Sequence, residues 1–190
     1  MGHYSQHLNT EIQLTRINMS ILDIVQEPDP VLRKKCDEVP AVDDELKKLM
    51  NNMLETMYNA PGIGLAAPQI GISKRVIVID ISRDGENKNP LFIVNPKIIW
   101  KSEELNAREE GCLSLPGHYA EVIRPAKCKL EYLDYNGKQQ IIEADDLLST
   151  CIQHEVDHCD GILFIDYLSK LKKDMIIKKL IKAKKEKEIL

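Results

Sequence analysis

The sequence predicts an α+β fold in which antiparallel sheets pack around a central helix that carries metal ligands. Short β-branched segments recur through the middle of the chain, and Asn136-Gly137 is a strong hairpin turn signal between two of them. A His-Glu-x-x-His pattern at residues 154–158 follows the last of these segments, with helical spacing. An amphipathic helix is predicted before the strands and a basic helix after them. With 190 residues, 43% of them hydrophobic, the chain is long enough for one well-buried domain and too short for two.

Residues 1–18 are expected to lie outside this catalytic domain, which we place at residues 19–190. They contain charged residues and histidines and lack the apolar stretch of a secretory signal. We interpret them as a disordered extension: a leader, an alternative start or an expression remnant, with Met19 as the natural beginning.

The first predicted element is an amphipathic helix that begins at Asp43 or Asp44, either of which can cap its first turn. Its apolar residues fall at steps of three and four, which places them on one face. They are Leu46, Leu49, Met50, Met53, Leu54 and Met57. This face is predicted to lie in the core.

A glycine-rich apolar segment, residues 62–71, follows the helix and contains Gln69 as its single polar side chain. Small residues there allow the backbone to come close to another segment. A phosphate-binding loop is the competing interpretation. It is rejected because the segment lacks the Gly-Lys-Ser/Thr ending and has no cation to meet a phosphate.

The middle of the chain is predicted to form antiparallel sheet. Turn-rich residues 83–87 separate the first two strands, and Asn136-Gly137 separates the last two. The predicted strands are residues 75–81, 91–95, 127–133 and 140–144.

Asp145 and Asp146 are predicted to begin the helix that carries the metal ligands. A helix places residues four apart on one face, so His154 and His158 can bind one metal ion. Glu155 lies between them and can deprotonate a water molecule whose pKa the ion has lowered. The pattern therefore predicts metal-assisted hydrolysis.

A hydrolytic metal ion usually has three protein ligands and an open position. The metalloproteases that add a third histidine are excluded, because Phe164 occupies its place. Glu186 and Glu188 are the only glutamates after the pattern, and both lie in a lysine-rich tail. Cys112 is the better third ligand. It is flanked by a glycine and apolar residues on a segment that is expected to be extended.

The composition excludes several classes of protein. Five cysteines form an odd set without disulfide spacing, which fits a reducing cytoplasm. No apolar run approaches the roughly 20 residues needed to cross a membrane. The net charge of -4 does not favour binding of DNA or another polyanion by the chain as a whole.

Three segments together resemble the peptide deformylase family, whose members remove the N-formyl group from newly made proteins. The motif Gly-x-Gly-x-Ala-Ala-x-Gln matches residues 62–69, Glu-Gly-Cys-Leu-Ser matches residues 110–114, and Gln-His-Glu-x-Asp-His matches residues 153–158. The resemblance extends from about Met19 into the basic C-terminal helix. It implies a hydrolase that releases formate from N-formyl-methionyl nascent peptides.

The resemblance implies that Cys112, His154 and His158 hold one divalent metal ion. Fe2+ is the expected native ion, and Zn2+, Ni2+ or Co2+ are expected substitutes, because all accept one sulfur and two nitrogens. No membrane or DNA partner is implied.

The resemblance also implies catalytic roles. Glu155 would act as general base and then as general acid. The side-chain amide of Gln69 and the backbone N–H of Leu113 would donate to the oxyanion.

Substrate binding is expected along an extended backbone, as an added strand. The resemblance implies main-chain pairing with Ile63, Gly64, Gly111 and the strand after Cys112. The expected walls of the methionine pocket are Ile63, Leu147, Thr150 and Cys151. Tyr119 stands where many members carry arginine, and the sequence offers no account of Cys159 and Asp160.

The basic helix at residues 170–187 has two open interpretations. It is either a solvated face on a packed helix or a docking element for the ribosome near the exit tunnel, as in some family members. Its apolar set is Leu171, Met175, Ile176, Leu180 and Ile181.

Two rival functions stay open. One is a zinc peptidase of the His-Glu-x-x-His type, which would cleave internal amide bonds. The other is a non-catalytic metal-binding or ribosome-associated module. The presence of both Glu155 and Gln69 argues against the second rival, because a structural metal site needs neither.

Overall fold

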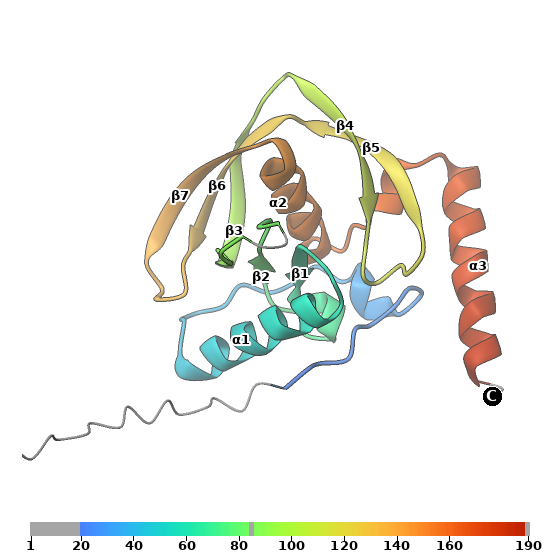
Figure 1. Cartoon of the computed structure of the whole chain (residues 1–190), viewed down its shortest axis with the longest axis horizontal. Helices are drawn as coiled ribbons and strands as arrows, with labels where there is room; N and C mark the ends of the chain where they lie inside the picture. Colours follow the sequence, from blue (N-terminus) through green and yellow to red (C-terminus); the bar gives the residue numbers. More distant parts are fainter. Residues whose placement is uncertain (1–19, 84–85, 189–190) are drawn as a thin grey trace, which may run out of the picture.

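A computed structural model describes residues 20–83 and 86–188, so the expected extension at residues 1–18 lies outside the described part of the chain. Figure 1 shows a central helix, α2 (Asp146–Cys159), surrounded by strands, with a second helix, α1 (Asp44–Asn59), beneath them. A third helix, α3 (Lys170–Glu188), stands at one side of the molecule. The arrangement confirms the predicted α+β fold around a central helix.

Five strands form one antiparallel sheet in the order β1-β2-β3-β6-β7. They are β1 (Gly64–Ala66), β2 (Val76–Ile79), β3 (Leu91–Lys101), β6 (Lys127–Leu133) and β7 (Gln139–Asp145). The turn between β6 and β7 contains Gly137 with φ of 75°, a left-handed conformation that glycine adopts without steric cost. The hairpin predicted from Asn136-Gly137 is therefore confirmed.

Two further strands, β4 (Leu105–Gly111) and β5 (Tyr119–Pro125), pair only with each other among the described strands. From the sequence we expected an extended segment at Cys112 and a strand after it, but gave bounds to neither β4 nor β5. Burial alternates along both, but charged residues occupy inward as well as outward positions, which hides the usual alternation of apolar and polar residues. The strand predicted at residues 91–95 is also longer than expected, because it continues to Lys101.

The apolar face of α1 packs against the five-stranded sheet, as predicted. Leu46, Met50, Met53 and Met57 are buried there with Val76 and Val78 of β2, among other residues. The Asp43 side chain accepts a hydrogen bond of 2.8 Å from the Leu46 N–H, which identifies Asp43 as the cap. The core thus fixes β1 and β2 above α1.

Helix α3 packs through fewer residues than its apolar set suggested. Leu180 is buried, with Ile176 and Ile177 against the same cluster as Phe164 of the short 3-10 helix η3 (Phe164–Tyr167). Leu171 and Met175, expected on the apolar side, are exposed by 72% and 50%. None of the helices in the described part of the chain is long and apolar enough to span a membrane.

Candidate metal centre and active site

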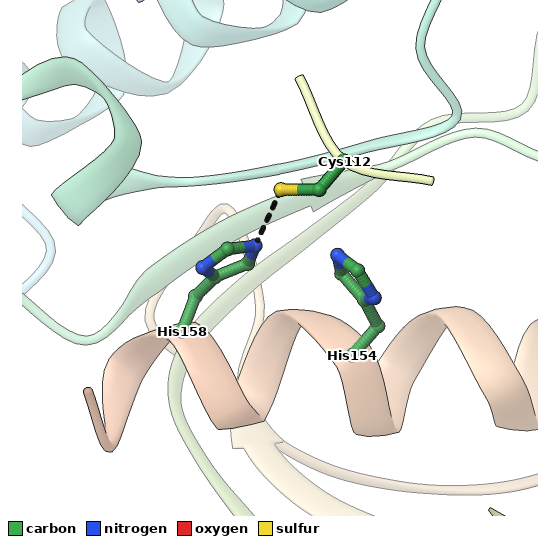
Figure 2. Close-up of side chains that lie close together, drawn as sticks. All are labelled: Cys112, His154 and His158. Atoms are coloured by element: carbon green, nitrogen blue, oxygen red, sulfur yellow. Dashed lines mark hydrogen bonds between the residues drawn. The ribbon is translucent and has the colours of Figure 1, made fainter. Parts of the chain in front are cut away.

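Two turns of α2 and the segment after β4 bring together the predicted metal ligands. Figure 2 shows His154 and His158 rising from one side of α2 toward Cys112. Possible ligand atoms of the three residues all lie within 4.8 Å of one another, and Cys112 Sγ lies 3.2 Å from His158 Nε2. The convergence arises because a helix places residues four apart on one face, while β4 ends at Gly111, directly before Cys112.

These ligand atoms fit a metal ion. Ligand distances of about 2.0 to 2.3 Å around a tetrahedral ion place sulfur and nitrogen roughly 3.5 Å apart, close to the observed spacing. His154 uses Nδ1 to bind Glu110, which leaves its Nε2 for an ion. His158 Nδ1 is buried and has no hydrogen-bond partner among the described residues.

A largely buried ionic network orients His154 through Nδ1, the ring nitrogen that is not assigned to the metal ion. His154 Nδ1 lies 2.8 Å from Glu110 Oε2, and Arg124 binds both oxygens of Glu110 at 2.5 and 3.0 Å. Arg124 also donates to Asp157 at 2.7 Å, and Tyr167 donates to the same Asp157 oxygen at 2.8 Å. The network holds the ring of His154 in one orientation and balances the charge of Glu110.

The network also sets protonation states. Burial by itself raises the pKa of Glu110, but hydrogen bonds from His154 and Arg124 outweigh it and lower that pKa, so Glu110 stays charged. Burial is the largest cause that holds the pKa of His158 well below its usual range, and the positive charge of Arg124 acts in the same direction. His158 is therefore neutral, the form that can bind a metal ion.

Glu155 is placed for proton transfer beside the ligands. It is buried, and its Oε2 has no hydrogen-bond partner among the described residues. Burial raises its pKa to about 7. A Cβ atom on Gly64 would contact Glu155 Oε1 and lie 2.9 Å from Cys151 Sγ, so this position needs glycine for β1 to approach α2.

Gln69 faces the ligands from the 3-10 helix η2 (Ala67–Ile70). Its Oε1 accepts a hydrogen bond of 2.8 Å from the Ala66 N–H, which fixes the amide. Its Nε2 lies 3.4 Å from Cys112 Sγ and 3.3 Å from Ser114 Oγ. The structure therefore brings a fixed N–H donor next to the ligand set.

A cleft of about 670 Å³ opens above these groups, between edges of β1 and β4 that pair with no other described strand. Two of the predicted ligands, Cys112 and His154, line this cleft. All the predicted catalytic and substrate-binding residues line it as well: Ile63, Gly64, Gln69, Gly111, Leu113, Leu147, Thr150, Cys151 and Glu155. An extended peptide can enter between these two edges.

Two details of the expected backbone pairing are wrong. The carbonyl of Ile63 accepts a hydrogen bond from the Asp80 N–H, so Ile63 pairs with the segment that ends β2. Because successive residues of a strand direct their backbone groups to opposite sides, Gly64 is the residue that faces the free edge. The strand after Cys112, β5, pairs with β4, and it is β4, which precedes Cys112, that lines the cleft.

The structure explains three residues that the sequence left open. The Tyr119 ring lies against Gly111, with Cδ1 2.6 Å from the position of a Cβ there, and 66% of Tyr119 is exposed. Asp160 pairs with Arg75 at 2.6 Å. Cys159 is buried beside Cys36, whose N–H donates to the Cys159 carbonyl at 2.8 Å.

Sequence reasoning missed two charged residues of the site, Arg124 and Arg108. Both lie at inward positions of β4 and β5, and Arg108 lines the cleft. The alternation of β5 places Val122 and Arg124 on the same buried side. A charged residue at an inward strand position is the signal that could have identified Arg124.

Fold and site together define the class of this protein: an α+β metal-dependent hydrolase with a candidate metal site of one sulfur and two nitrogen atoms. The family model described as Polypeptide deformylase matches residues 21–174. The chain belongs to the polypeptide deformylase family. It is an enzyme that removes the N-formyl group from the formyl-methionine of nascent polypeptides.

Relatives and solved structures agree with this assignment. A peptide deformylase of Pelagibacter ubique is 58% identical over 90% of this chain and 100% of its own length. One from Rhizobium meliloti is 54% identical over 88% of this chain and 96% of its own length. The crystal structure of the Ehrlichia chaffeensis enzyme has a TM-score of 0.84 at 40% identity, covering 90% of this chain and 100% of that chain. A second structure of that enzyme, in complex with actinonin, has a TM-score of 0.83 at 43% identity over 87% of this chain and 98% of that chain.

Proposed function

We propose that Cys112, His154 and His158 bind one divalent iron ion, and that Glu155 moves the proton during hydrolysis of the formyl amide. The observation that carries this proposal is the convergence of three ligand atoms within 4.8 Å beside a buried carboxylate. When bound, the ion supplies positive charge that polarises the formyl oxygen and acidifies the attacking water.

Glu155 is the proton carrier in this proposal. It takes a proton from the attacking water and delivers it to the amine nitrogen as the bond between the formyl carbon and that nitrogen breaks. Formate and a free N-terminal amine are the products. The support is its place between the two histidine ligands on α2, with Oε2 free of any described hydrogen-bond partner.

Gln69 and the backbone N–H of Leu113 stabilise the oxyanion that forms on the formyl oxygen. The fixed amide of Gln69, 3.4 Å from Cys112 Sγ, supports this role. Replacement of Gln69 by Leu is expected to lower kcat by an amount equivalent to about 3 kcal/mol, with little change in KM. A change confined to KM would contradict the assignment.

The peptide enters as an added strand between β1 and β4, paired with Gly64 and Gly111. Its methionine side chain occupies a pocket between Ile63 and the face of α2 formed by Leu147, Thr150 and Cys151, which are spaced to point the same way. Main-chain pairing is independent of sequence, which suits an enzyme that acts on many nascent chains.

The decisive experiment compares formyl-Met-Ala-Ser with unformylated Met-Ala-Ser. Release of formate from the first peptide, with no cleavage of the second, is the expected result. Cleavage of internal amide bonds in either peptide would favour the zinc peptidase alternative.

Two variants test the residue roles. Glu155→Gln is expected to retain the metal and lose nearly all turnover. Cys112→Ser is expected to lose metal, because a hydroxyl group is not ionised at neutral pH. An active Glu155→Gln enzyme, or unchanged metal content in Cys112→Ser, would contradict the corresponding assignment.

The native ion is tested by anaerobic purification with elemental analysis. The same ligand set accepts zinc, nickel and cobalt. Iron in stoichiometric amount, with activity that falls on exposure to air, is the expected result. Stoichiometric zinc with full activity would overturn the choice of iron.

We also propose that the enzyme acts in the cytoplasm and docks on the ribosome through α3. All five cysteines are free thiols, which fits a reducing compartment, and most lysines of α3 are exposed. Because Leu180 is buried, truncation of α3 would disturb the core, so charge removal is the better test. Lys172, Lys178, Lys179 and Lys182 changed together to Gln should weaken ribosome pelleting at low salt, while Lys47→Gln with Lys48→Gln on α1 should not. Unchanged pelleting would overturn the docking proposal.

A further inference from the structure

An ion pair bridges the two walls of the cleft at the end far from the metal ligands. Arg108 of β4 donates through Nη2 to Asp146, the first residue of α2. The Asp146 side chain is 72% exposed and that of Arg108 is 31% exposed. Neither residue takes part in the ionic network behind His154.

Asp146 has a backbone conformation that favours glycine. Its φ is 46°, one of two positive φ values among the described residues other than glycine. Aspartate tolerates this region better than most residues, but a left-handed residue other than glycine still has a steric cost. A carboxylate in this backbone conformation points to a use for its side chain, and Arg108 is the group it reaches.

The same two walls run from the metal ligands to this pair. Along α2, His154, Cys151, Thr150 and Leu147 line the cleft at helical spacing, and Asp146 directly precedes Leu147. At 1.5 Å per residue, Leu147 lies roughly 10 Å from His154 along the helix axis. Along β4, Glu110 contacts His154 and Arg108 contacts Asp146. If the formyl group of a peptide lies at the ligands, the first side chain of that peptide therefore extends toward Arg108.

Arg108 has hydrogen-bond donors to spare. The guanidinium group has five N–H donors, and Asp146 is its hydrogen-bond acceptor in the described part of the chain. Its Nε is buried with no hydrogen-bond partner among the described residues. The Arg108 side chain as a whole is 31% exposed, so the N–H donors that Asp146 does not use are available to an acceptor on the substrate.

We propose that Arg108, anchored by Asp146, closes the far end of the pocket for the first side chain and donates a hydrogen bond to the end of that side chain. The substrate class is N-formyl peptides whose first side chain ends in an acceptor. The sulfur of methionine is a weak acceptor, and the oxygen of methionine sulfoxide is a strong one. The enzyme thus accepts formyl peptides whose first methionine has been oxidised. This inference rests on the proposed function, because it assumes that the formyl group lies at the ligands.

The test measures kcat and KM for formyl-Met-Ala-Ser, its methionine sulfoxide form and its norleucine analogue. Norleucine has the shape of methionine and no acceptor. Arg108→Met keeps an unbranched side chain and removes the donors. We expect it to lower the kcat/KM of the sulfoxide peptide, relative to the kcat/KM of the norleucine peptide, about tenfold.

Two further variants complete the design. Asp146→Gly suits the left-handed backbone and releases Arg108, so the same ratio should fall by a smaller factor. Lys129→Gln removes a cation from an ion pair on the outer face of the sheet, between Lys129 and Glu143 at 2.6 Å, and should leave the ratio unchanged.

Several results would overturn the inference. The first is a sulfoxide-to-norleucine kcat/KM ratio in Arg108→Met equal to that of wild type. The second is an equal loss of kcat/KM for all three peptides, which would indicate a main-chain contact. The third is no activity of the wild-type enzyme on the sulfoxide peptide. A wild-type ratio in Asp146→Gly would overturn the anchoring role of Asp146. Failure of the wild-type enzyme to release formate from formyl-Met-Ala-Ser would instead refute the proposed function.

Discussion

Gly64 shows how one residue without a side chain shapes this site. It lies where β1 passes closest to Glu155 and Cys151, and it directs its backbone groups to the free edge of the sheet. The family motif identified this glycine from the sequence, but its physical reason is a contact with residues 87 and 91 positions later in the chain. The local sequence pattern indicated that the backbone at Gly64 comes close to another segment, and the fold shows that this segment is α2.

Gly64→Ala is expected to impair catalysis more than folding. The added Cβ would contact Glu155 Oε1 and displace the carboxylate, and misplacement of a catalytic group by about 1 Å can cost roughly 100-fold in rate. We expect kcat/KM for formyl-Met-Ala-Ser to fall by about that factor at unchanged metal content. Wild-type activity in this variant would show that Glu155 tolerates the displacement.

Arg124 is the residue whose loss should affect both stability and metal binding. It is 4% exposed and neutralises Glu110 and Asp157, so Arg124→Met leaves one buried and one partly buried carboxylate without their cation. We expect the free energy of unfolding in urea to fall by about 3 to 5 kcal/mol, and metal affinity to fall roughly 10- to 100-fold because His154 loses its fixed orientation.

The matched control is Lys129→Met, which removes a cation from an exposed pair. It should change the free energy of unfolding by less than about 1 kcal/mol and leave metal affinity intact. Equal effects of the two variants would contradict a special role for the buried network.

Among the elements, those with a strong local pattern were predicted well. Helix α1 is capped by Asp43, one of the two predicted caps, and most of its predicted stripe is buried; β6 matches residues 127–133. The bounds of β4 and β5 and their pairing were not predicted, although this pair supplies one wall of the cleft. Its inward side carries Arg108, Glu110 and Arg124, whose burial depends on partners from α2 and not on apolar character.

At the scale of elements, Asp166 ties η3 to two neighbours. It accepts hydrogen bonds from Arg33 of the 3-10 helix η1 (Pro30–Arg33) at 2.6 Å and from Lys173 of α3 at 2.5 Å. Burial raises the pKa of Asp166, but Lys173, the Leu163 N–H and Arg33 together lower it below its usual value. A carboxyl group whose pKa is lowered by folding stabilises the protein above its unfolded pKa of about 4, and this contribution disappears as pH falls through the folded value.

Asp166→Asn is therefore expected to destabilise the protein by about 2 kcal/mol near neutral pH, because hydrogen bonds to a charged group are lost. The difference in free energy of unfolding between wild type and variant should shrink as pH falls below about 4. Urea unfolding from pH 3 to 7 measures it. A difference that stays constant over this range would show that the charge of Asp166 does not contribute.

For the whole molecule, the metal site joins segments that are far apart in the chain. Cys112 follows β4, while His154 and His158 belong to α2, so a bound ion links the small sheet to the central helix. An ion that binds only the folded state stabilises that state by mass action.

Removal of the ion with a chelator should accordingly lower the midpoint of thermal unfolding. At an ion concentration of 100 times Kd the stabilisation is about 2.7 kcal/mol. For a domain of this size that corresponds to a shift of roughly 5 to 10 °C. Readdition of the ion should restore the midpoint in wild type and not in Cys112→Ser. A midpoint that does not respond to the chelator would contradict a metal link between the two segments.

The sequence by itself determined the features that depend on neighbouring residues. Helical spacing placed His154, Glu155 and His158 on one element, alternation and a turn signal placed β6 and β7, and three motifs identified the family. Only the tertiary structure decided which groups meet across the cleft. The pairing of Glu110 with His154, the burial of Arg124 and the contact of Arg108 with Asp146 join residues 14 to 44 positions apart. Local periodicity is set by the backbone of one segment, whereas these contacts depend on how separate segments pack, and that is fixed by the core as a whole.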